Sequence, residues 1–348
     1  MAQIDLLFQN LIKLSGSDFH LEQGQKPKIR VHGHLGEIAE SAQLTQDSII
    51  HLLREIASAE DWQKFEHQGD LDFAYALGEE ARFRANYYRH FHGLGAVFRL
   101  IPSKIRALKE LDLPKCLEDF ADLRSGLVLV TGPTGSGKST TLASIIDHIN
   151  ASCHKKIITI EEPVEFIHPN KNSLITHREV GLDTKSFASG LRSALKSDID
   201  IILVGEMRDR ETIELALTAA ERGILVFGTL HTNSAVKTID RIIDVFPTNK
   251  KNQIRTVLAN SLKGVVAQQL IPSIDGQRRY IAYEILLSVP ALGPIILSGQ
   301  TNKLISEIQT NRKRGMILLD DCLQQLVSDG KIKKEDAYIK AQNKSKFK

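Results

Sequence analysis

The chain has 348 residues, of which 42% are hydrophobic and 25% charged, and its formal net charge is +3. This length favours two domains, the composition is that of a globular protein, and the charge is too small to indicate nucleic acid as the main partner. No apolar stretch approaches the roughly 18 residues of a membrane span. The scattered Cys116, Cys153 and Cys322 indicate a reducing compartment with neither disulfides nor a zinc site. We therefore expect a cytoplasmic protein.

The first hundred residues predict an N-terminal α+β domain over 1–101. Apolar residues recur at helical spacing in 4–14, which predicts a helix. Alternating or apolar segments that we expect to form a small antiparallel sheet follow at 71–77, 82–88 and 95–101. Pro102 and the charged stretch after it indicate a linker over 102–125.

The pattern changes at residue 126. Short apolar runs without alternation occur at 127–131, 156–160, 199–204 and 224–230. Strands that are buried on both faces and joined by helices form parallel sheets, so residues 126–289 predict an α/β domain. Pro290 and Pro294 then introduce a region over 290–348 that we expect to be mainly helical.

The segment VLVTGPTGSGKSTTLA contains the phosphate-binding pattern G-x-x-x-x-G-K-S, between an apolar strand and a helix. Glycines let backbone N–H groups turn towards phosphates, and the helix directs its positive end at them. Lys138 is expected to reach the β- and γ-phosphates of ATP, and the Ser139 hydroxyl to bind Mg²⁺. The predicted nucleotide-binding residues are Gly132, Pro133, Thr134, Gly135, Ser136, Gly137, Lys138, Ser139 and Thr140.

Acidic residues follow two of the predicted strands. Glu161, Glu162 and Glu165 come after 156–160, and Glu206 comes after 199–204. In P-loop enzymes one acid at a neighbouring strand tip coordinates Mg²⁺ or its waters, and a further carboxylate orients the attacking water. Any one of these glutamates could instead be a solvated strand end.

His231 follows the strand at 224–230. A single histidine there is either a structural residue or part of the site, because ligands bind at the carboxyl edge of such sheets.

The ordered motifs GPTGSGKSTT, IEEPVEF, REVGLDT, LRSAL, DIILVGEMRDRETIELALTAAE and GTLHT resemble those of the secretion-superfamily ATPases. The likeness is strongest to the PilT-like type IV pilus retraction ATPases of twitching motility, and it runs from about residue 15 to about residue 330. The resemblance implies an α/β architecture in which a PAS-like N-terminal α+β domain precedes a RecA-like P-loop domain and a helical C-terminal part. It also implies a homohexamer whose ATP-driven domain rotations act on an inner-membrane platform protein, so that the ring lies at the inner face of the membrane.

The resemblance also assigns roles to residues. It makes Glu206 the Walker B glutamate, a metal residue together with Ser139, and it places the catalytic acid within the stretch Glu161 to Glu165. The spacing favours Glu165 as that acid, with Glu161 as second choice. Arg84 and Arg99 match N-terminal arginines that approach the γ-phosphate, where a guanidinium would neutralise developing charge.

The chain departs from the family pattern at three places. Ile224 stands where the family has the first histidine of its His box, so only His231 remains. The retraction signature A-I-R-N-L-I corresponds here to ALGPII, with Gly293 and Pro294 replacing Arg and Asn. Beyond the first turn of a helix such a proline would be strained. Glu162 replaces an aspartate.

Three alternatives remain open at this stage. An accessory paralogue would bind ATP and work beside a separate retraction motor, which the departures at Ile224 and at Gly293 favour. Pilus-assembly and type II secretion ATPases commonly carry paired C-x-x-C motifs, which three scattered cysteines do not supply. A nucleic-acid motor would need a basic, aromatic-bearing loop, and no nucleic-acid partner is expected.

Overall fold

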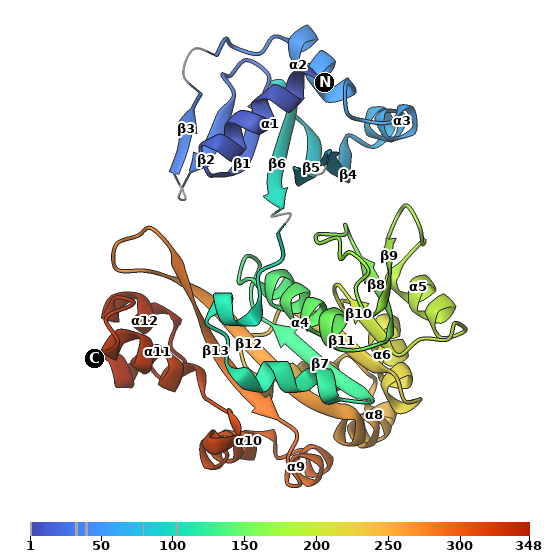
Figure 1. Cartoon of the computed structure of the whole chain (residues 1–348), viewed down its shortest axis with the longest axis vertical. Coiled ribbons are helices and arrows are strands. Elements are labelled where there is room, and N and C mark those ends of the chain that lie inside the picture. The colour runs from blue at the N-terminus through green and yellow to red at the C-terminus, as the bar shows by residue number, and fades with distance from the viewer. Residues whose placement is uncertain (1, 32–33, 39–40, 79, 102–103) are drawn as a thin grey trace. The chain divides into compact units, whose positions relative to one another are not determined.

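The computed structural model describes residues 2–31, 34–38, 41–78, 80–101 and 104–348, and the chain divides into two compact units, Met1–Lys104 and Ile105–Lys348 (Figure 1). Pro102, expected at the start of the linker, lies outside the described residues. Among those residues, no helix has both the length and the apolar character needed to cross a membrane.

In the residues that the structure describes, the first unit is an antiparallel six-stranded sheet with three helices. Its sheet has the order β3-β2-β1-β6-β5-β4. The strands are β1 (Gly16–Glu22), β2 (Lys28–Val31), β3 (His34–Glu37), β4 (Asp70–Leu77), β5 (Ala81–His90) and β6 (Gly93–Ile101), and the helices are α1 (Gln3–Lys13), α2 (Gln46–Arg54) and α3 (Ala59–Gln68). The helix and the three strands predicted from periodicity are therefore confirmed as α1, β4, β5 and β6.

Aromatic side chains form the core of this unit. Phe8 of α1 stacks on Phe83 of β5 at 4.2 Å between ring centroids and meets Phe98 of β6 edge-on at 5.0 Å. All three rings are fully buried. Offset stacked and edge-to-face pairs are favourable ring arrangements, so α1 is fixed to the sheet at this point.

The second unit is built on a seven-stranded sheet of order β13-β12-β7-β11-β10-β8-β9. Its strands are β7 (Gly126–Thr131), β8 (Lys156–Glu161), β9 (Leu174–Glu179), β10 (Ile201–Val204), β11 (Leu225–Leu230), β12 (Leu262–Pro272) and β13 (Arg279–Leu287). Every neighbouring pair is parallel except β12 and β13, which are antiparallel. The four predicted strands are present, but the sheet is mixed rather than purely parallel.

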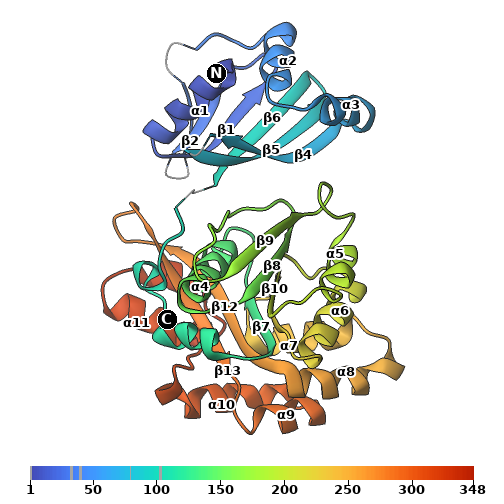
Figure 2. The ribbon, with the colours of Figure 1, turned by 45° about the vertical axis from the view of Figure 1, so that its right-hand side comes forward.

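Helices cover both faces of this sheet (Figure 2). They are α4 (Lys138–Ser152), α5 (Phe187–Ala194), α6 (Arg210–Glu221), α7 (Ala235–Asp244) and α8 (Thr248–Ser261), with α9 (Leu292–Ser298), α10 (Leu304–Thr310), α11 (Leu319–Ser328) and α12 (Lys334–Lys340) after the sheet. Along β7, Leu127 and Leu129 join the core under α5 to α9, whereas Val128 and Val130 join the core under α4. The unbroken apolar runs thus supply both cores.

Much of the stretch expected to be a linker belongs to the second unit instead. Two 3₁₀ helices, η1 (Leu108–Leu111) and η2 (Lys115–Asp122), pack on α4. Leu117 is fully buried and Phe120 is 3% exposed in the core under α4. The prediction of a linker was wrong here because the stretch also carries apolar residues at helical spacing between its charged residues. Such apolar residues are buried against another surface.

Candidate active site

The phosphate-binding pattern forms the turn between β7 and α4. Gly132, Gly135 and Gly137 have φ values of 146°, 76° and 87°, a region that favours glycine. A Cβ at Gly132 would lie 2.3 Å from the Gln268 carbonyl oxygen, whereas one at Gly135 would meet nothing within 4 Å. The turn is therefore tight where it leaves the strand and open at its apex, as a cradle for phosphate requires.

Lys138, the first residue of α4, folds back over this turn. Its Nζ donates to the carbonyl oxygens of Gly132 at 3.0 Å and Pro133 at 3.1 Å. Burial lowers the pKa of Lys138, while the charges of Glu206 and Glu165 oppose that shift. Glu165 and Glu206, two of the acids predicted at strand ends, therefore act electrostatically on the lysine of the phosphate-binding turn.

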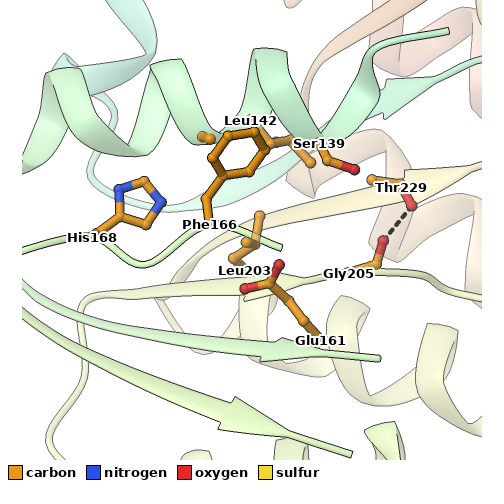
Figure 3. A pocket seen from close by; sticks show the side chains of 9 residues that line it. Ser139, Leu142, Glu161, Phe166, His168, Leu203, Gly205 and Thr229 are labelled. Carbon is orange, nitrogen blue, oxygen red and sulfur yellow. Dashed lines mark hydrogen bonds between the residues drawn. The ribbon is translucent and has the colours of Figure 1, made fainter. Parts of the chain in front are cut away.

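Glu161 ends β8 beside the start of α4. It is 9% exposed, and burial raises its pKa to about 7. It shares a cavity of about 30 Å³ with Ser139, room for one or two water molecules, and Phe166 and His168 line the same cavity (Figure 3). Glu165 is half-buried, and its backbone N–H lies 3.5 Å from a carboxylate oxygen of Glu161.

Glu206 follows β10 and is held by two side chains. Arg208 Nη2 lies 2.7 Å from its Oε2, and His231 Nε2 lies 2.9 Å from its Oε1. Burial acts to raise the pKa of Glu206, but the hydrogen bonds and charges of Arg208 and His231 outweigh it and hold that pKa below its usual range. His231 is therefore next to a predicted catalytic carboxylate rather than apart from it.

Sequence reasoning missed Arg208. Besides pairing with Glu206, its Nη1 lies 3.8 Å from Glu162 Oε2, so this guanidinium lies between the acids of two strand ends. The available signal was its position two residues after Glu206 in GEMRD.

The predicted arginines of the N-terminal domain lie in the first unit. Arg99 Nε donates to Asp18 Oδ1 at 2.8 Å, and Arg84 Nε lies 3.7 Å from Asp72 Oδ1. Both guanidinium groups are substantially exposed. Their approach to a γ-phosphate remains a prediction.

The residues present fit a nucleoside triphosphate and Mg²⁺. The residues predicted to bind nucleotide, 132–140, form a single turn and the first turn of the fifteen-residue helix α4, so free N–H groups and the helix dipole are available to phosphate. Ser139 offers its hydroxyl at the edge of a cavity that also holds a carboxylate, and Mg²⁺ prefers such oxygen ligands and keeps several waters.

Residues 1–324 match the family model described as type II/IV secretion system protein. The chain is 47% identical to the type IV pilus retractation ATPase PilT of Pseudomonas aeruginosa, over 96% of this chain and 97% of that protein. It is 34% identical to the type IV pilus ATPase PilU of the same organism, over 97% and 88% of the two chains. A crystal structure of the pilus retraction motor PilT with bound ADP matches with a TM-score of 0.91 at 40% identity, covering 99% of both chains. The family resemblance predicted from the motifs is confirmed, and the chain belongs to the type II/IV secretion system protein family.

Proposed function

We propose that this chain is an ATPase that drives type IV pilus retraction. The observation that carries the proposal is the 47% identity to a retraction ATPase over nearly the whole of both chains, and the phosphate-binding pattern G-x-x-x-x-G-K-S supports it. The charges of Glu165 and Glu206 both act to raise the pKa of Lys138, which supports a role for these two acids near the phosphate-binding lysine.

The side chains divide the chemistry among them. Lys138 would leave the carbonyls of Gly132 and Pro133 to bind the β- and γ-phosphates, and Ser139 and Glu206 would hold Mg²⁺ or its waters. Bound Mg²⁺ would neutralise charge on the phosphates. Glu165 is the acid proposed to orient the attacking water, since it is half-buried and its charge acts on Lys138. Glu161 is the second choice, because burial raises its pKa to about 7, a value that suits a general base.

Arg84 and Arg99 are proposed to approach the γ-phosphate and neutralise charge that develops during transfer. Exchanging Asp18 for a phosphate would keep the Arg99 guanidinium paired with an anion.

The output is proposed to be movement of one unit against the other within a homohexamer. ATP and ADP differ in their contacts to the acids and arginines, so each favours a different relation of the two units. The ring would lie at the inner face of the membrane and act on a pilus platform protein there, with other pilus ATPases as possible further partners.

Steady-state ATP turnover, measured across protein concentrations, tests the chemistry. Wild type should show turnover that rises steeply as rings assemble, Glu206→Ala should abolish it, and the exposed Glu221→Ala should behave as wild type. Wild-type turnover no faster than that of Glu206→Ala would refute the proposal.

An accessory role is the second candidate, because Ile224 and Gly293–Pro294 depart from the retraction pattern. Cells that lack their own retraction ATPase distinguish the two roles. A motor restores twitching when it is the single retraction ATPase in the cell. An accessory protein restores twitching only when a second pilus ATPase is present.

A further inference from the structure

Glu284 is a buried carboxylate outside the predicted site. It lies on β13 with 3% of its surface exposed, and it accepts hydrogen bonds from three separate parts of the second unit. Burial raises its pKa, and the backbone N–H groups of Ala235 and Leu319 oppose that shift. A buried carboxylate destabilises the fold unless it keeps its hydrogen-bond partners. The partners of Glu284 therefore show which parts of the second unit it holds together.

The first partner is the start of α7. The Ala235 backbone N–H donates to Glu284 Oε1 at 2.7 Å, and Ser234 caps the same helix. Three residues earlier in this loop is His231, which contacts Glu206. Glu284 therefore holds the carboxyl-side end of the loop that carries His231.

The same helix also reaches the P-loop strand. The Thr238 hydroxyl lies 3.5 Å from the Thr131 hydroxyl, directly before Gly132, and 2.7 Å from that of Thr232. The first turn of α7 thus lies between Glu284 and the end of β7, so a shift of this turn moves the loop and the strand end together.

The other partners belong to the C-terminal region. Leu319, the first residue of α11, has its N–H 3.5 Å from Glu284 Oε2, and Gln342 Nε2 lies 3.4 Å from the same oxygen. Gln342 Nε2 also lies 3.4 Å from the Asn233 carbonyl oxygen in the His231 loop. Buried Asp320 fixes this end of the chain, since it accepts from the backbone N–H groups of Gln342 and Asn343, each at 2.8 Å.

We propose that Glu284 is a positioning residue for ATP hydrolysis: together with Gln342 it ties the C-terminal segment to the His231 loop, so that displacement of this segment loosens His231 at Glu206. The proposal rests on the proposed function, because it assumes that Glu206 and His231 act on the nucleotide. Through this link the C-terminal helices affect the geometry of the site, although none of their residues is predicted to touch ATP. A partner that pulls on α11 or the tail would thereby change turnover.

Two variants of the full chain separate this role from simple folding. Gln342→Ala removes the tail amide and leaves every buried group in place. Glu284→Gln can still accept from Ala235 but presents its NH₂ to the donors of Leu319 and Gln342. Lys346→Ala is the control, because Lys346 is on the same tail and pairs only with Asp321 among the described residues.

The first measurement is hydrogen–deuterium exchange of the segment 232–238, which needs no turnover. Loss of the two long bonds of Gln342 Nε2, to Glu284 and to Asn233, should speed exchange about fivefold in Gln342→Ala. Glu284→Gln loses the bonds from Leu319 and Gln342 and turns an NH₂ group towards both donors, so exchange should speed up at least about tenfold. The second measurement is kinetics: kcat should fall by similar factors while KM for ATP stays unchanged, because phosphate binding is untouched.

Unchanged exchange in both variants would overturn the link, and faster exchange with unchanged kcat would overturn the positioning role. Lys346→Ala should match wild type in both measurements, and an equal effect there would also count against the proposal. Failure of the proposed function looks different: wild type would then turn over no faster than Glu206→Ala, while the exchange comparison would still decide whether Glu284 and Gln342 hold the loop.

Discussion

His231 Nε2 lies 2.9 Å from Glu206 Oε1, although the two residues end different strands and stand 25 positions apart in the chain. β10 and β11 are parallel neighbours, so their carboxyl ends meet at one edge of the sheet and bring these side chains together. With Arg208 on its other oxygen, the Glu206 carboxylate is held on two sides. Its charge and orientation are set by these neighbours, which can be changed one at a time.

Arg208→Gln should move the acid limb of the ATPase pH profile to higher pH. Arg208 contributes to the lowered pKa of Glu206, so charged Glu206 persists as pH falls and is lost only at its lowered pKa. Without the guanidinium that pKa rises towards its ordinary value, and the charged form is lost at a higher pH. The acid limb of kcat/KM against pH reports this group in the free enzyme. Arg210→Gln, an exposed neighbour, should leave the profile unchanged, and an unmoved limb in Arg208→Gln would contradict the expectation.

Lys138→Ala should weaken nucleotide binding without unfolding the chain. Among the described residues the Nζ donates to two carbonyl oxygens of its own loop, so the variant removes a phosphate partner and hydrogen bonds within that loop. Hydrogen bonds to charged groups predict a loss of about ten- to a hundredfold in affinity. Titration with a fluorescent ATP analogue measures it. Lys171→Ala, which breaks the ion pair of this exposed lysine with Asp147 on the same unit, is the matched control. Equal affinities for the two variants would contradict the role of Lys138.

The parts of the site that sequence predicted are those with local signals. The phosphate-binding turn is recognised by glycines at fixed spacing. An acid at a strand end is recognised once the apolar run of the strand before it has been identified. Glu284 lacked such a signal, and that of Arg208, its position two residues after Glu206, was weak. Arg208 is one charged residue among several, and its role appears only when β8 and β10 pair and place Glu162 beside Glu206.

The strands, too, could be predicted only where the sequence carries a local signal. Runs buried on both faces, such as β7 and β11, were visible in the sequence because nothing polar interrupts them. β9 was not, because its burial is broken by His177 and Arg178. The antiparallel pair β12 and β13 carries Gln268 and Glu284 at buried positions, and their hydrogen-bond partners Ser136 and Ala235 are distant in sequence.

Phe120→Ala should destabilise the second unit. Phe120 lies in the stretch expected to be a linker, but it is 3% exposed in the core under α4 and lies where a Cβ on Gly264 would be 2.9 Å from its ring. Truncation of such a ring costs about 3–5 kcal/mol. Urea unfolding followed by circular dichroism should show an earlier transition. Trp62, the single tryptophan, reports the first unit, and its fluorescence transition should stay in place.

Phe91→Ala is the control for that experiment, since this ring is 95% exposed. If residues 105–125 were a linker without packing, Phe120→Ala would unfold at the same urea concentration as Phe91→Ala.

Gly293→Arg with Pro294→Asn should change pilus movement without changing ATP turnover. Helix α9 begins at Leu292, so Pro294 is its third residue and falls in the first turn, where the missing N–H would have no helical acceptor. A Cβ at Gly293 would lie 3.6 Å from the Ala259 carbonyl oxygen, so a side chain fits there. The double variant should therefore unfold within about 1 kcal/mol of wild type.

Because α9 packs on α8, and the predicted nucleotide-binding residues lie in the turn between β7 and α4, the departure ALGPII is expected to act on coupling to the pilus. The measurement is a pair: steady-state ATP turnover of the purified double variant, and retraction in cells that carry it as their only retraction ATPase. Unchanged turnover with altered retraction places this stretch downstream of hydrolysis. Altered turnover would instead mean that α9 influences the site itself, and the coupling interpretation would have to be abandoned.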